Sequence, residues 1–117
     1  MPRFETWLRN DLKKMPSVVS LDGVFFAKDS GGNLVGVEVT DNGAPASLTG
    51  TVKGYFVLSD GTTLQANGTL SENRASVILP DGAYNVPGPV SIVIKLGDTT
   101  VGACTGFIRK SITETII

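Results

Sequence analysis

Apolar and polar residues alternate with a period of two through most of this chain. Within residues 34–40, valines at every second position alternate with Gly36, Glu38 and Thr40. This is the pattern of a β-strand with one buried face. Comparable segments lie at 18–26, 52–58, 64–70, 75–79, 90–96 and 99–109. The pattern therefore predicts about seven short strands.

Turns rich in glycine, proline and aspartate separate these segments. Asp60-Gly61, Asp81-Gly82 and Gly97-Asp98 supply residues that favour tight turns. Residues 41–50, which contain Gly43 and Pro45, are predicted to form a loop between sheets rather than a tight hairpin. The number and spacing of the strands favour an all-β fold, a single immunoglobulin-like antiparallel β-sandwich over residues 18–110. Its core is expected to include Phe56, Val77 and Ile94.

Residues 1–17 have a different pattern and are interpreted as an N-terminal docking arm. Apolar residues at helix-like intervals would line one face of a helix, and the opposite face would carry Arg9, Asp11, Lys13 and Lys14. This pattern favours an amphipathic helix. An extended strand against a neighbour remains the alternative. Pro16 is expected to separate the arm from the sandwich. The apolar residues predicted to contact a partner are Phe4, Trp7, Leu8 and Leu12.

Residues 111–117 form a C-terminal tail with apolar residues and no charged side chain except Glu114. Ile112, Ile116 and Ile117 are predicted to contact a partner because free apolar ends need covering. Folding of the tail back onto its own sheet is the alternative. For Trp7 the two interpretations are an interface anchor and a ring packed on its own domain.

The composition argues against catalysis. The 117-residue chain has no histidine and one cysteine, and it lacks the C-x-x-C and G-x-S-x-G motifs. We therefore expect no enzyme, no cofactor and no metal site. A calcium site built from two Asp-Gly loops is the alternative, but the chain lacks an EF-hand-like ligand spacing. Cys104 is expected to be a small buried hydrophobe, and Tyr84 to be structural, with its hydroxyl bonded to nearby backbone.

Charge and hydrophobicity bear on partners. The formal net charge is −1, only 18% of residues are charged and 41% are hydrophobic, whereas typical domains have roughly 25% charged residues. This predicts no binding to nucleic acid and a surface partly covered by a protein partner. No segment has the length of a membrane span or the apolar core of a signal peptide, so no membrane association is expected.

The order of the segments between Asp41 and Leu96 carries a resemblance. Five segments follow one another in this region: the run D-N-G-A-P-A-S-L-T-G, the strand VKGYFVL, the turn S-D-G-T-T, the strand ASVILP and the run D-G-A-Y-N-V-P-G-P-V-S-I-V-I-K-L. Together they resemble the N-terminal module of phage baseplate upper proteins and related small virion proteins. The resemblance spans about residues 18–110.

The resemblance implies a non-enzymatic virion structural protein. Because the sequence ends soon after Arg109, where the baseplate proteins continue, we expect a cement, decoration or adaptor subunit on the capsid or on the tail and baseplate. The related modules imply a homotrimer that contacts other virion proteins and is made in the host cytoplasm. The alternative function is a carbohydrate-binding sandwich for adhesion to a host surface.

Overall fold

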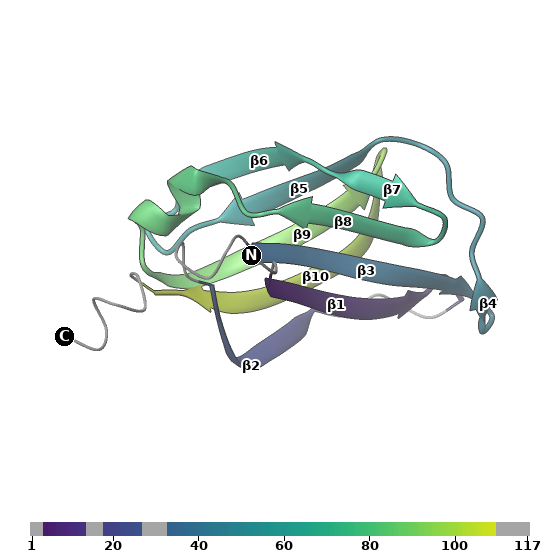
Figure 1. Ribbon diagram of the computed structural model, residues 1–117, viewed down its shortest axis with the longest axis horizontal. Helices are drawn as coiled ribbons and strands as arrows, with labels where there is room; N and C mark the ends of the chain where they lie inside the picture. The colour runs from purple at the N-terminus through teal and green to yellow at the C-terminus, as the bar shows by residue number, and fades with distance from the viewer. Residues whose placement is uncertain (1–3, 14–17, 27–32, 110–117) are drawn as a thin grey trace.

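The computed structural model describes residues 4–13, 18–26 and 33–109. Two β-sheets stack face to face (Figure 1). The first sheet has the order β1-β3-β8-β7, with β4 attached to β3. Its strands are β1 (Phe4–Asp11), β3 (Asn33–Asp41), β4 (Ala44–Pro45), β7 (Thr69–Ser71) and β8 (Arg74–Ile78).

The second sheet has the order β2-β10-β9-β5-β6. Its strands are β2 (Val19–Phe26), β5 (Val52–Val57), β6 (Thr63–Asn67), β9 (Gly88–Leu96) and β10 (Thr99–Ile108). A short 3₁₀ turn, η2 (Asp81–Asn85), follows β8 at one end of the sandwich. The all-β sandwich predicted from the alternating pattern is therefore confirmed.

Both sheets are mixed, so the prediction of a purely antiparallel fold is wrong. β1 runs parallel to β3, and β2 runs parallel to β10. The remaining neighbours are antiparallel. Alternation within a strand reports which face is buried but carries no information about the direction of the neighbouring strand, which explains the error.

The helix favoured for the N-terminal arm is also wrong, because residues 4–11 form β1. Leu8 lies opposite Val37 of β3 in the parallel register and is only 6% exposed. A short helix is only marginally stable on its own. The strand is favoured because it buries the Leu8 side chain and pairs its backbone with β3. Residues 4–11 thus belong to the sandwich rather than to a separate arm.

The core lies between the two sheets. Phe56, Val77 and Ile94 are all buried, as predicted, and so are the valines at positions 35, 37 and 39. The sheets approach closely at Gly54, where an added Cβ would lie 2.9 Å from both γ-carbons of Val77. Val77 of the first sheet thus leaves no room for a side chain at this position of β5.

The segment 64–70, predicted as one strand, divides at Gly68 into β6 and β7, which belong to different sheets. An added Cβ at Gly68 would lie 2.4 Å from the backbone oxygen of Ser76. Only glycine permits this close crossing. The described residues accordingly contain ten strands rather than about seven, counting β1 and the two-residue β4.

The loop predicted at 41–50 begins with a tight hairpin. Asn42 and Gly43 both have positive φ, 53° and 88°, and they connect β3 to β4. Asn-Gly is the sequence that two-residue hairpins of this kind prefer. The prediction that a tight turn is absent here is therefore wrong.

Candidate functional site

Trp7 lies on the outer face of the first sheet. Alternation along β1 directs Leu8 into the core and leaves Trp7 outward, 40% exposed. Its parallel register partner is Gly36, and an added Cβ there would lie 2.4 Å from ring carbon Cζ3 of Trp7. The indole ring thus rests on the strand where the neighbouring residue has no side chain.

Charged groups surround the ring. The Trp7 Nε1–H donates to Oε1 of Glu5 at 3.0 Å, and the Arg74 guanidinium carbon lies 5.6 Å from the ring centroid. Nη2 of Arg74 lies 3.8 Å from Oε2 of Glu38, its register partner across β3 and β8. At such exposed sites a cation–π contact contributes about 0.5–1 kcal/mol, and a salt bridge contributes less than about 1 kcal/mol.

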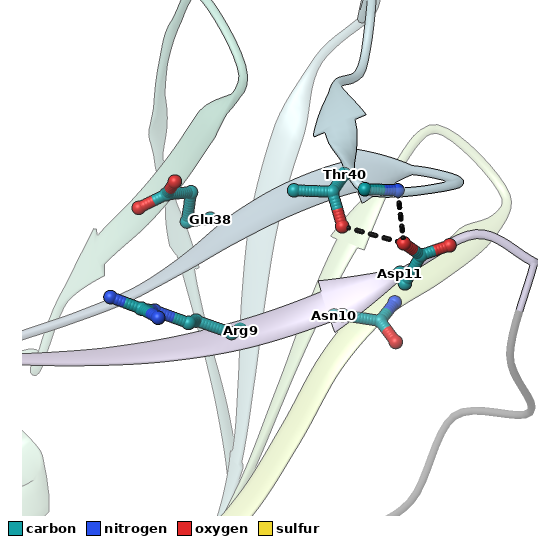
Figure 2. A pocket seen from close by; sticks show the side chains of 6 residues that line it. Arg9, Asn10, Asp11, Glu38 and Thr40 are labelled. Atoms are coloured by element: carbon teal, nitrogen blue, oxygen red, sulfur yellow. Dashed lines mark hydrogen bonds between the residues drawn. The ribbon is translucent and has the colours of Figure 1, made fainter.

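Two shallow grooves meet on this surface. The first, about 270 Å³, is lined by Trp7, Leu8, Arg9, Glu38 and Arg74. The second, about 470 Å³, shares Arg9 and Glu38 with the first and continues to Asp11 (Figure 2). We call the outward residues Trp7, Arg9, Glu38 and Arg74 the Trp7 face. It offers one aromatic surface, two guanidinium groups and one carboxylate.

Asp11 closes the far end of the second groove. Its carboxylate accepts hydrogen bonds from the backbone N–H groups of Lys13, Asn42 and Gly43 and from the hydroxyl of Thr40, at 2.8–3.0 Å. These donors lower the pKa of Asp11 to about 2, with the Lys13 N–H making the largest contribution. Asp11 thus fastens the end of β1 to the β3–β4 hairpin.

Two other residues singled out in the sequence are structural. Cys104 is buried, and burial raises the pKa of its thiol to about 11, so the thiolate is scarce at neutral pH. This confirms the prediction of a small buried hydrophobe. The Tyr84 hydroxyl accepts a 2.6 Å hydrogen bond from Nδ2 of buried Asn33, a side chain rather than the expected backbone. Burial raises the Tyr84 pKa, opposed by this hydrogen bond.

The seven residues predicted to contact a partner have different placements. Trp7 is half-exposed on the sheet, and Leu12, just after β1, is 46% exposed. Leu8 belongs to the chain's own core and is only 6% exposed, which removes it from the predicted interface. Phe4 is the first residue of β1, and its side chain lies outside the description. Ile112, Ile116 and Ile117 lie outside the described residues.

Sequence reasoning missed the polar members of the Trp7 face and several further exposed apolar residues, among them Val57, Ile78 and Phe107. Val57 and Phe107 face outward from the second sheet, and Ile78 faces outward from β8. Each of them is out of phase with the buried residues of its own strand. That phase is the signal that could have identified them. The pairing of Arg74 with Trp7 needed the order β1-β3-β8, which the sequence does not encode locally.

Within residues 4–13, 18–26 and 33–109, no group of three potential metal-ligating side chains comes together. In the same part of the chain, no helix has the length and apolar character required to cross a bilayer. A scan against protein-family models finds no matching family, and a search of curated proteins finds no match to this chain.

Proposed function

We propose that this chain is a non-enzymatic virion structural subunit of a bacteriophage, a decoration, cement or adaptor protein. It attaches to the capsid surface or to the tail and baseplate through the Trp7 face. The proposal retains the resemblance of residues 18–110 to the baseplate-type module. The observation that carries it is the placement of Trp7, a large aromatic side chain half-exposed on a rigid sheet and bordered by arginine. Tryptophan and arginine are the residues most enriched at the energetic centres of protein interfaces.

The proposed fold within the all-β class is immunoglobulin-like. In that arrangement one sheet contains strands A, B, E and D, and the other contains G, F and C with an added C′ strand. The order β3-β8-β7 corresponds to B-E-D, and the order β10-β9-β5-β6 corresponds to G-F-C-C′, which supports this assignment. The first strand departs from this arrangement, because β1 pairs with β3 in parallel whereas strands A and B pair antiparallel. Modules of this kind commonly supply a stable frame whose outer faces bind other proteins.

The proposed partners are a major capsid protein or a tail and baseplate protein, and further copies of this chain. We retain the homotrimer as the order that the related modules imply. The surface offers no strong net charge toward nucleic acid, since the formal net charge is −1. The mature location proposed is the virion, after synthesis in the host cytoplasm.

The experiment measures incorporation into particles purified from an infected host. Trp7→Ala should lower occupancy on the particle at least about tenfold, because loss of an interface anchor typically costs about 2 kcal/mol or more. Val57→Ala, a truncation of another exposed apolar residue on the opposite outer face, is the matched control and should be incorporated normally. Normal occupancy of the Trp7→Ala protein contradicts the proposal.

The second candidate function is carbohydrate binding for adhesion to a host surface. The half-exposed indole ring beside Arg9, Glu38 and Arg74 favours it, because aromatic rings stack on sugars while charged and amide groups bind hydroxyls. Binding of the isolated protein on a glycan array, lost in Trp7→Ala and retained in Val57→Ala, would support this candidate over the virion interface.

A further inference from the structure

The outer edge of β6 stands apart from the other open edges of the sandwich. β6 is the terminal strand of the second sheet, and no described residue pairs with its outer side. Its five residues, Thr-Leu-Gln-Ala-Asn, include no charge, glycine or proline. By contrast, β1 carries Glu5, Arg9 and Asp11, and β7 has only three residues. β2 contains Asp22 and Gly23, and its pairing with β10 is irregular. Charges, short length and irregularity are the usual protection of edge strands against pairing, and β6 lacks all of them.

The hydrogen-bond phase of β6 shows which of its backbone groups point outward. Leu58 N–H donates to the Thr62 carbonyl, and Gly68 N–H donates to the Val52 carbonyl. Because hydrogen-bonded and non-hydrogen-bonded pairs alternate in an antiparallel ladder, Leu64 and Ala66 also direct their backbone groups to β5. The N–H and C=O groups of Thr63, Gln65 and Asn67 therefore point away from the sheet.

We propose that β6 is a self-association edge, at which β6 of a second copy pairs antiparallel about a two-fold axis at Gln65. In this register Gln65 lies opposite Gln65, and Thr63 lies opposite Asn67. All three positions present the outward backbone groups that a hydrogen-bonded pair requires. Two-fold contacts of this kind use the same surface patch on both copies.

Side chains on the two faces of β6 fit this register. Leu64 and Ala66 point between the sheets, where they pack against the core while remaining only partly buried. In the paired register Leu64 lies opposite Ala66 of the second copy, which covers the remaining apolar surface. On the outer face, glutamine and the Thr–Asn pairs provide uncharged hydrogen-bonding groups. Cross-strand pairs of this kind stabilise a sheet.

The charge distribution does not oppose the pairing. The nearest lysine row on the outer face is Lys53 and Lys95, which face each other across β5 and β9 at the Asn67 end of β6. The two-fold axis places the Lys53–Lys95 pair in line with Thr63 and Val57 of the second copy. The two lysine pairs therefore do not meet. Like charges are thus kept apart, and an uncharged copy of the same edge is a fitting occupant.

The inference does not depend on the virion role. A two-fold contact gives a dimer, or joins two of the proposed trimers into a six-copy assembly. The experiment is light scattering of the full chain over a concentration series up to about 1 mM, where a weak specific contact becomes populated. The expected mass is two or six times 12.2 kDa. A chain that remains monomeric, or that stops at three copies, overturns the proposal.

The edge variant is Gln65→Lys, and the matched control is Ser91→Lys. Gln65 and Ser91 are both exposed on the outer face of the second sheet, but Ser91 lies on the interior strand β9. Gln65→Lys places two like charges opposite each other at the axis and should weaken the even-numbered species at least about tenfold, with an unchanged melting temperature of the dissociated chain. Ser91→Lys should leave the species unchanged. Equal effects of the two variants, or association through a different protein only, contradict the assignment.

Discussion

Gly43 donates its backbone N–H to the carboxylate of Asp11 at 2.8 Å, across 32 residues of sequence. The contact joins the end of β1 to the β3–β4 hairpin (Figure 2). Asn42 donates to the other oxygen of the same carboxylate. One ionised side chain therefore fixes the strand that carries Trp7 to the turn that follows its neighbour.

Stability should depend on the ionisation of Asp11. Its pKa is about 2 in the folded protein against 3.8 ordinarily, so the folded state favours the carboxylate. The contribution is fully present above the ordinary pKa and is lost as pH falls from about 4 through 2. Asp11→Asn should lower Tm at pH 7, and the difference from the parent should shrink as pH falls to 2. Thr40→Val, which removes one of the donors, should lower Tm less. A Tm difference equal at pH 7 and pH 2 would contradict this account.

The seat of Trp7 on Gly36 can be tested by adding a single methyl group. Gly36→Ala places a Cβ inside the ring position, and the exposed ring must move away. Because the chain has one tryptophan, its fluorescence reports the change, and a shift to longer wavelength is expected. Gly54→Ala instead meets the buried Val77 side chain and should cost about 1–3 kcal/mol. Unchanged emission of Gly36→Ala would contradict the described contact.

β1 should contribute to the stability of the isolated domain through Leu8. Leu8→Ala is expected to cost about 2–5 kcal/mol, because it leaves a cavity in the core. Leu12→Ala, at an exposed position, should change stability by less than about 0.5 kcal/mol. Urea denaturation measures both. Similar small effects would mean that β1 docks elsewhere in solution. By the same reasoning, deletion of residues 1–16 should lower Tm, contrary to an independent arm.

Phe56 and Val57 provide a test of which face of β5 is buried. Phe56 is 0% exposed and Val57 is 43% exposed, although they are neighbours in sequence. Phe56→Ala should cost about 3–5 kcal/mol, and Val57→Ala less than about 0.5 kcal/mol. Chemical denaturation checks both values. Comparable costs for the two variants would indicate a shifted register between β5 and β9.

Most of the fold could be predicted from the sequence because alternation identifies a strand and its buried face. Val35, Phe56 and Ile94 are assigned correctly for that reason. The division of the segment 64–70 could not be predicted, because Gly68 is required by the position of Ser76 in the folded structure. The candidate site was identified only in part. Trp7 stood out by residue type. That Leu8 and Trp7 point in opposite directions could be inferred only once β1 is known to be a strand.

The crossing of the chain at Gly68 bears on the order of folding. β5–β6 and β7–β8 are hairpins of near neighbours, and the single residue between them links the two sheets. These local pairs have a low entropic cost of closure. The parallel pairs β1–β3 and β2–β10 join segments that are distant in sequence, with β2 and β10 near opposite ends of the described chain, so we expect them to form late. In pulsed hydrogen exchange during refolding, amides of the local hairpins β5–β6, β7–β8 and β9–β10 should be protected before those of β1 and β2.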